Sequence, residues 1–132
     1  MPLDHVSIGV TDVRRARRFY DAVLAPLGWK PVMPVEVKGT LLGVGYGEAA
    51  QPVFWIQLPA NERPASAGNG VHVAFNAATR EQVDAFYLAA LEQGGVDDGK
   101  PGLRTEYHPD YYGAFVRDPD GNKVEACCHT HA

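Results

Sequence analysis

Two segments of the chain carry apolar residues at the three- and four-residue spacing of an amphipathic helix. In the first segment the apolar stripe consists of Ala16, Phe19, Tyr20, Val23, Leu24 and Leu27. In the second it consists of Val83, Phe86, Tyr87, Ala90 and Leu91. Thr11 or Asp12 can cap the first helix, and Thr79 with Gln82 three residues later forms a capping box before the second. The pattern therefore predicts two helices, each with one face to bury.

Shorter runs of apolar and polar residues predict strands around each helix. One run precedes each helix, beginning near His5 in the first case and near His72 in the second. After the helices, strands are expected at about 29–35, 40–46, 52–58, 96–103, 112–117 and 122–129. Because side chains alternate between the two faces of a strand, the apolar faces should meet the helices and the mixed faces should point away from them.

The two halves of the chain are similar to each other at an offset of 67 residues, which is the separation of His5 and His72. Other aligned pairs are Phe19-Tyr20 with Phe86-Tyr87, Leu24 with Leu91, and Gly28 with Gly95. A repeat at fixed spacing indicates a duplicated structural unit. We expect one α+β domain, residues 1–132, made of two tandem βαβββ modules that form a cupped mixed sheet. Module one covers about 1–58, a linker rich in Pro and Gly about 59–70, and module two about 71–132.

Composition narrows the partners of this domain. The formal net charge is -4 and the pI about 5.7, which argues against general binding to nucleic acid or to anionic membranes. No run approaches the roughly 20 apolar residues of a membrane span, and no signal peptide is evident, so a cytoplasmic protein is expected. Cys127 and Cys128 are neighbours and cannot form a disulfide framework. Isolated modules would expose a sheet edge and a sheet face, so we expect the modules to pack together, within one chain or between two chains, and a homodimer is one hypothesis.

Four polar side chains are predicted on the faces that point away from the helices: His5, Gln57, His72 and Glu125. The histidines open the modules and the other two lie in the last strands, 68 residues apart, so one inserted residue makes their places equivalent. Two imidazoles, a carboxylate and an amide oxygen suit a divalent transition metal. The alternative is that the histidines are ordinary half-buried residues and that Glu125 pairs with Lys123 or a nearby arginine.

Aromatic residues are expected to line the same concavity. The predicted substrate pocket consists of Tyr46, Trp55, His108, Tyr111 and Tyr112, with Trp55 on the same strand face as Gln57. The segment EYHPDYYG at 106–113 could supply acid–base groups, or its aromatic rings could simply pack. The glycines of GVGYG at 43–47 alternate within a strand and indicate a bulge or a close approach of backbone.

Nearly the whole chain resembles the vicinal oxygen chelate superfamily, which includes glyoxalase I, extradiol dioxygenases, fosfomycin-resistance thiol transferases and bleomycin-binding proteins. The resemblance rests on HVSIGVTDVRRARRFYDAVL, FWIQL, HVAF and FVRDPDGNKVE. It implies paired βαβββ modules around a cupped sheet, usually in a homodimer. It also implies that a metal held by His5, Gln57, His72 and Glu125 promotes chemistry at vicinal oxygens of a small substrate.

The chain departs from bacterial glyoxalase I at two positions. Gln57 stands where that family has a glutamate, and Gly9 stands where it has an arginine that holds the carboxylate of glutathione. These departures weaken the case for glutathione as part of the substrate.

Three functions are open on the sequence alone. The first is a metal-dependent lyase or isomerase of the glyoxalase type, in which zinc, nickel, cobalt or manganese polarises a carbonyl and Glu125 is the base. The second is an Fe(II) dioxygenase, because two histidines and one carboxylate are also the ligands of many non-haem iron oxygenases. The third is a metal-free protein that binds a drug or another small molecule in the aromatic cleft.

Overall fold

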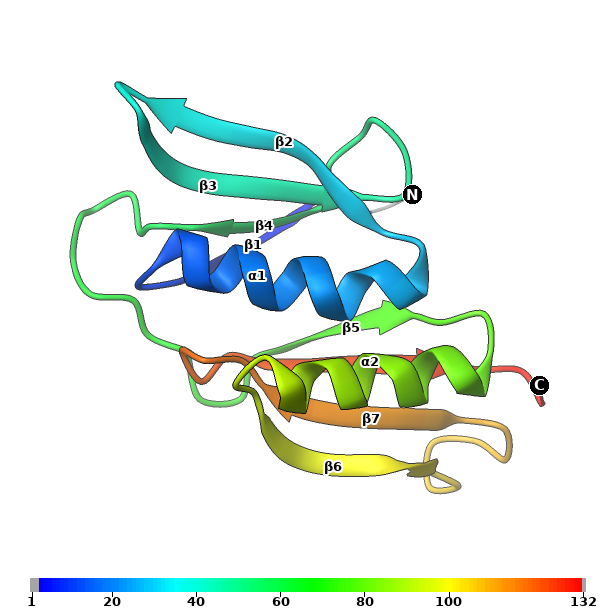
Figure 1. Cartoon of the computed structure of the whole chain (residues 1–132). Coiled ribbons are helices and arrows are strands. Elements are labelled where there is room, and N and C mark those ends of the chain that lie inside the picture. The colour runs from blue at the N-terminus through cyan, green and yellow to red at the C-terminus, as the bar shows by residue number, and fades with distance from the viewer. Residues whose placement is uncertain (1–2, 132) are drawn as a thin grey trace.

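The structure is a computed structural model that describes residues 3–131. It consists of two βαβββ modules in tandem (Figure 1). Module one contains β1 (Val6–Gly9), α1 (Val13–Leu24), a 3-10 turn η1 (Ala25–Leu27), β2 (Lys30–Val37), β3 (Thr40–Gly47) and β4 (Phe54–Gln57). Module two contains β5 (His72–Asn76), α2 (Arg80–Glu92), β6 (Val96–Leu103), β7 (Tyr112–Arg117) and β8 (Lys123–Cys128). The predicted α+β fold and all predicted elements are confirmed.

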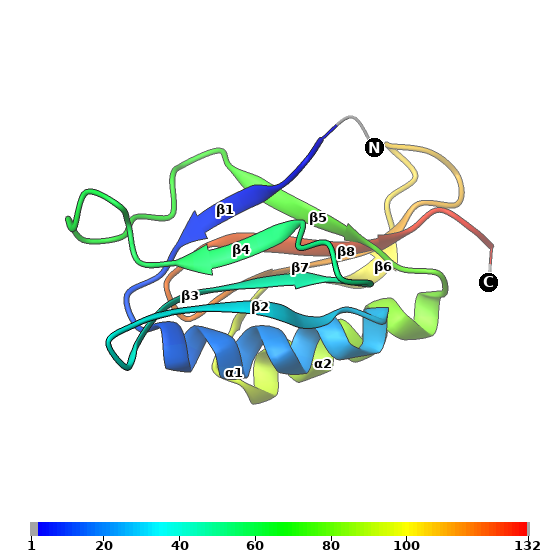
Figure 2. The same cartoon turned by 90° about the horizontal axis from the view of Figure 1, so that it is seen from above.

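The eight strands form two four-stranded sheets with the same topology. Their orders are β1-β4-β3-β2 and β5-β8-β7-β6, and in each the first and last strands of the module pair in parallel while the other pairs are antiparallel. Both helices lie on one side of the sheets, which leaves the opposite sheet faces open (Figure 2). The expected cup is therefore divided into two sheets, one per module, and no ladder joins them within residues 3–131.

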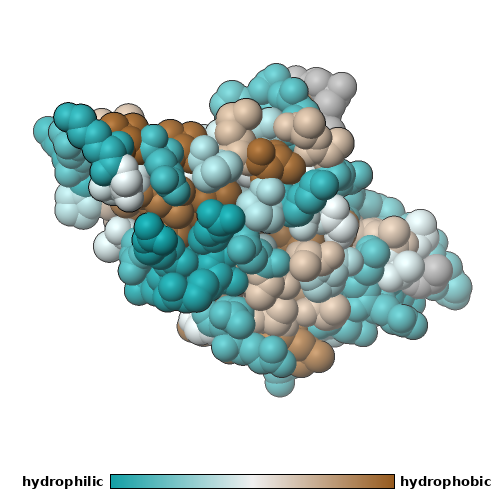
Figure 3. Space-filling view, turned by 45° about the horizontal axis from the view of Figure 1, so that its top comes forward, coloured by the Kyte–Doolittle hydropathy of each residue, from teal (hydrophilic) through white to brown (hydrophobic). Residues whose placement is uncertain are grey.

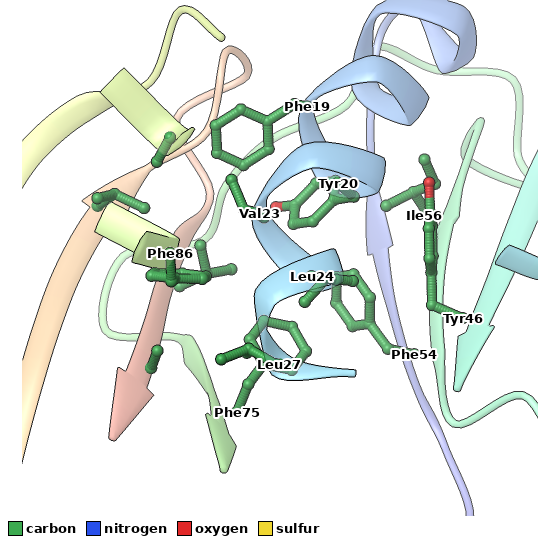
Figure 4. Close-up of a cluster of buried hydrophobic side chains, with 14 of the residues drawn as sticks. Phe19, Tyr20, Val23, Leu24, Leu27, Tyr46, Phe54, Ile56, Phe75 and Phe86 are labelled. Carbon is green, nitrogen blue, oxygen red and sulfur yellow. The ribbon is translucent and has the colours of Figure 1, made fainter. Parts of the chain in front are cut away.

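The core lies between the helices and the sheets and is shared by the two modules. In Figure 4, α1 runs between side chains of module one, such as Phe54, and side chains of module two, such as Phe86. Phe54 and Phe75 meet edge to face with ring centroids 5.0 Å apart, which joins the two sheets through aromatic contact. None of the helices in the described part of the chain is long and apolar enough to cross a membrane.

Local side-chain hydrogen bonds fix where the helices begin and end. The Asp12 carboxylate accepts from the Arg15 N–H, and the Thr79 hydroxyl accepts from the Gln82 N–H, as the caps predict. The amide oxygen of Gln82 accepts from the N–H of Ala78 rather than of Thr79, so the expected capping box is shifted by one residue.

Leu24 and Leu91 occupy matching places in the repeat but differ in burial. Leu24 is 0% exposed and Leu91 is 40% exposed, so the prediction that Leu91 belongs to the buried stripe is wrong. We expect Leu24→Ala to lower the free energy of unfolding by about 2–5 kcal/mol, because it opens a cavity in the shared core. Leu91→Ala, the matched control, should change it by less than about 1 kcal/mol. Urea unfolding monitored by circular dichroism measures both, and equal losses would contradict this assignment of the core.

Candidate functional site

Glu125 is the centre of the polar site in module two. Its carboxylate is almost completely buried, with the residue 1% exposed, on the open face of the second sheet. Its oxygens have two polar partners: the hydroxyl of Tyr111 donates to Oε2, and His72 Nε2 lies 3.3 Å from Oε1. Lys123 was a possible ion-pair partner of Glu125, but its Nζ lies 3.7 Å from Asp98 Oδ2 instead. No ion pair joins Glu125 to a lysine or arginine anywhere in residues 3–131, so this carboxylate is buried without a fixed cation.

Strand register explains why Glu125 and His72 meet. In the parallel pair of β5 and β8, Glu125 stands opposite Ala74, and His72 stands two residues before Ala74 on the same face. A diagonal pair at this spacing lies within reach of long side chains. Phe115 stands opposite Glu125 on the other side, in β7, and its ring centroid lies 6.0 Å from that of His72.

Tyr111 is held against the carboxylate by two histidines. The His108 and His129 rings stack with centroids 5.0 Å apart, and their Nε2 and Nδ1 atoms are 2.8 Å apart. The Tyr111 ring packs edge-on against both rings. Burial and the hydrogen bond to Glu125 raise the pKa of Tyr111 well above its usual value, so its hydroxyl stays protonated as a donor.

Two members of this cluster, Cys127 and His129, were not among the predicted site residues. Cys127 lies on the same strand face as Glu125, with Sγ 3.9 Å from His129 Nε2, and burial raises the pKa of its thiol. The alternation of side chains in β8 placed Cys127 on this face, but nothing in the sequence indicated that the C-terminal His129 turns back to meet His108.

Two predicted pocket residues point into the core side of the sheets. Tyr46 is 0% exposed and stands opposite Phe54, and its hydroxyl donates to Asp21 Oδ1 at 2.8 Å. Tyr112 faces α2, where its hydroxyl donates to Asp84 Oδ1 at 2.7 Å. The assignment of Tyr46 and Tyr112 to the pocket is therefore corrected. Adjacent strand residues face opposite ways, so Tyr112 cannot share the side of Tyr111.

The open face of module one carries His5, Trp55 and Gln57, but in a different arrangement from the one expected. His5 is exposed and its Nδ1 lies 2.6 Å from Asp4 Oδ1. Gln57 stands opposite Gly9 in the parallel pair of β1 and β4. Gly9 lies four residues after His5, so Gln57 and His5 are separated by roughly 13 Å along the strand direction. Trp55 stands opposite Ser7, two residues after His5, as Glu125 stands opposite Ala74, two residues after His72. Trp55 thus occupies the place in module one that Glu125 occupies in module two. Gln57 was predicted to occupy that place, and this prediction is wrong, because the pairing register of the strands sets equivalent positions and the spacing in the sequence does not.

The single chain does not bring the four predicted ligands together. His72 and Glu125 meet, whereas His5 lines a hollow together with residues 73–76 of β5, and His72 does not line it. The strands β1 and β5 run in opposite directions (Figure 2), so the histidines that open them lie at opposite ends. Among residues 3–131 no three His, Cys, Asp or Glu side chains converge on a point that could hold a metal ion. Of the four predicted ligands in this part of the chain, only His72 and Glu125 lie close enough together to bind the same ion.

The chain is an α+β protein made of two βαβββ modules whose open sheet faces carry polar residues. Comparison with known proteins identifies the family to which the chain belongs. A model of the glyoxalase/bleomycin resistance protein/dioxygenase superfamily matches residues 2–126, and the chain belongs to this superfamily. No curated protein sequence matches it significantly.

Solved structures agree with this assignment. A glyoxalase/bleomycin resistance protein from Albidiferax ferrireducens T118 is 37% identical, with a TM-score of 0.85 over 98% of this chain and 100% of that one. A putative glyoxalase from Bacillus halodurans is 25% identical, with a TM-score of 0.67 over 96% of this chain and 94% of that one. The V278E mutant of glyoxalase I from Zea mays is 26% identical, with a TM-score of 0.75 over 98% of this chain and 47% of that one.

Proposed function

We propose that the chain is a metal-dependent lyase or isomerase of the glyoxalase type, acting on a small substrate with vicinal oxygens, and that two copies of the chain complete each site. The observation that carries the proposal is the Glu125 carboxylate, which is buried at 1% exposure and has Tyr111 and His72, but no lysine or arginine, as polar partners within residues 3–131. A buried carboxylate without a cation is costly unless it binds a metal or exchanges a proton.

The donor set fits a divalent ion only in part within one chain. His72 Nε2 and Glu125 Oε1 are 3.3 Å apart and can share one ion, and His5 of a second copy is the third ligand in the proposal. Such an ion, when bound, would polarise a substrate carbonyl. The Glu125 carboxylate would take the proton from the carbon next to that carbonyl, and the electron pair of the broken C–H bond would move toward the carbonyl oxygen. The Tyr111 hydroxyl holds Oε2 and leaves Oε1 to face His72 and the open side.

The residue at position 9 supports a substrate without glutathione. Gly9 has no side chain that could hold the carboxylate of glutathione, as the arginine of bacterial glyoxalase I does. A β-carbon at this position would lie in ordinary contact with the linker between the modules, 3.4 Å from Ala65 and 3.6 Å from Pro59. An arginine introduced at position 9 would therefore start beside the linker.

One observation favours a second candidate, the Fe(II) dioxygenase. Trp55, which has no metal-binding atom, occupies the position equivalent to Glu125, and Gln57 is an amide, which leaves two histidines and one carboxylate as the strong ligands. This is the ligand set of many non-haem iron oxygenases. An activity panel separates the candidates. Conversion of hemithioacetals without oxygen uptake supports the lyase, and oxygen uptake with catechols after anaerobic loading with Fe(II) supports the dioxygenase.

Elemental analysis of protein purified without chelators is expected to show about one divalent ion per chain in a dimer, because symmetry gives a dimer two equal sites. His72→Ala should lose most of this metal, and His131→Ala, a change at an exposed histidine, should retain it. A protein that takes up no zinc, nickel, cobalt, manganese or iron would contradict the proposal. Metal-independent ligand binding that survives His5→Ala and Glu125→Ala would favour the binding protein instead.

Mixing two inactive variants tests whether the site is shared between copies. His5→Ala and Glu125→Ala are each expected to be inactive alone. After unfolding and joint refolding, half of the dimers are mixed, and each mixed dimer has one site with both native halves, so about a quarter of the activity should return. Full inactivity of the mixture would contradict a site built from two chains.

A further inference from the structure

The row of glycines in β3 allows Trp55 to lie across the open face of module one. Gly45 stands opposite Trp55, and a side chain at residue 45 would come within 2.9 Å of the Cε2 and Cη2 atoms of the indole. It would also come within 2.8 Å of Pro52. Real Cβ atoms do not approach other atoms so closely, so the indole occupies the space that glycine leaves free. The sequence GVGYG thus makes room for an aromatic ring on the sheet.

Module two has the reverse arrangement at the equivalent places. There Phe115 of β7 stands opposite Glu125 of β8, where module one has Gly45 opposite Trp55. The large aromatic side chain lies in the third strand of module two and in the fourth strand of module one, where Trp55 takes the place that Glu125 has in module two. The two open faces have the same backbone and different chemistry: module two presents a carboxylate and an imidazole, and module one presents an indole.

The surface around Trp55 is hollowed and apolar on one side. A hollow of about 420 Å³ is lined by Asp4, His5, Ser7, Val35, Gln51, Pro52, Trp55 and Gln57. Met33 and Val35 of the edge strand β2 stand opposite Gly45 and Gly43 and are 45% and 39% exposed. Figure 3 shows apolar surface gathered near the β2–β3 hairpin. Gln57 and Ser7 supply polar groups on the other side of the indole.

We propose that this face of module one is a subsite for a planar, unsaturated ring of the substrate, which stacks on the Trp55 indole while Gln57 and Ser7 bind its polar substituents. The inference rests on the proposed function and adds a substrate class to it: aryl or conjugated compounds are preferred over saturated compounds with the same oxygen pattern. Flat stacking requires a flat platform, which Gly45 provides, and an apolar border, which Met33 and Val35 provide.

The test measures binding of 2-naphthol and of its saturated analogue decahydro-2-naphthol to the full chain by calorimetry. 2-Naphthol is expected to bind at least tenfold more tightly than the saturated alcohol. Trp55→Leu keeps an apolar side chain and removes the ring, so it should weaken 2-naphthol binding at least tenfold. Gly45→Ala should weaken it as well, because the added methyl group displaces the indole. Trp29→Phe, at the other tryptophan, is the matched control and should leave the affinity unchanged.

Equal affinity for the two alcohols, or an unchanged affinity in Trp55→Leu with native circular dichroism, would overturn the subsite. If Trp55→Leu fails to fold, the Gly45→Ala result decides in the same way. Repeating the titration with a chelator separates this inference from the proposed function. Ring binding that persists in a protein that takes up no metal supports the subsite and counts against the metal enzyme. Metal uptake without any preference for the planar ring supports the metal enzyme and counts against the subsite.

Discussion

Glu125→Gln is expected to lower kcat/KM by about 10²- to 10⁴-fold, the range for loss of a general base, and to reduce bound metal in parallel. The substitution keeps the size of the side chain and one oxygen that can accept from Tyr111, but it removes the charge and the basic oxygen. It also removes the uncompensated buried charge, so the free energy of unfolding should stay the same or rise. Activity lost while stability is kept distinguishes a functional carboxylate from a structural one.

Assays with the substrate found in the activity panel and thermal unfolding without metal measure the two effects of Glu125→Gln. Glu92→Gln, at the exposed end of α2, is the matched control and should change neither. A Glu125→Gln protein with native activity and metal content would show that the buried carboxylate is not the base. A large loss of stability in the metal-free protein would show that Glu125 mainly supports the fold through His72 and Tyr111.

The sequence predicted the elements well because the signals were local. Helical spacing and strand alternation depend on neighbouring residues, and the duplication supplied each pattern twice. Leu91 was the exception. It matches Leu24 in the repeat, but α1 is flanked by side chains of both modules (Figure 4), whereas Leu91 lies near the end of α2 and is exposed. Burial of residue 91 depends on how the two modules pack against each other, and the helical spacing of apolar residues gives no information about that packing.

The strand faces that carry several candidate residues followed from the sequence, but the arrangement of those residues did not. Alternation correctly placed Glu125, His72 and Trp55 on the open faces, because it needs only the strand itself. Which residue stands beside which depends on register between strands far apart in the chain. That register puts Trp55, not Gln57, at the place of Glu125, and it puts Tyr46 opposite the core residue Phe54. The meeting of His108 with His129 also depends on the path of two loops.

The turn DPDG joins the two modules as well as leading into β8. Asp118, which is 3% exposed, accepts from the N–H groups of Asp120 and Asn122 at Oδ1, and from Tyr20 of α1 and the Asn122 amide at Oδ2. Asn122 in turn donates to the carbonyl of Gly9, at the end of β1. One carboxylate thus organises the turn before the Glu125 strand and binds it to the first helix.

Asp118→Ala is accordingly expected to lower the free energy of unfolding by about 3–5 kcal/mol, since it leaves the buried Tyr20 hydroxyl and two backbone N–H groups without their acceptor. Tyr20→Phe removes the hydroxyl itself and should cost about 1–3 kcal/mol. Asp98→Ala removes a part-exposed partner of Arg117 and Lys123 and should cost about 0–1 kcal/mol.

The free energies of urea unfolding of the wild type, of Asp118→Ala, of Tyr20→Phe and of the variant that combines the two changes form a double-mutant cycle. Asp98→Ala is measured beside the cycle as the control. If Asp118 joins the modules through Tyr20, the double variant should be less destabilised than the sum of the two single changes, because both remove the same contact. Strict additivity would mean that Asp118 stabilises only its own turn. The expected coupling matters for function because the turn sets the position of β8 against β1, and with it the placement of the Glu125 carboxylate relative to the rest of the chain.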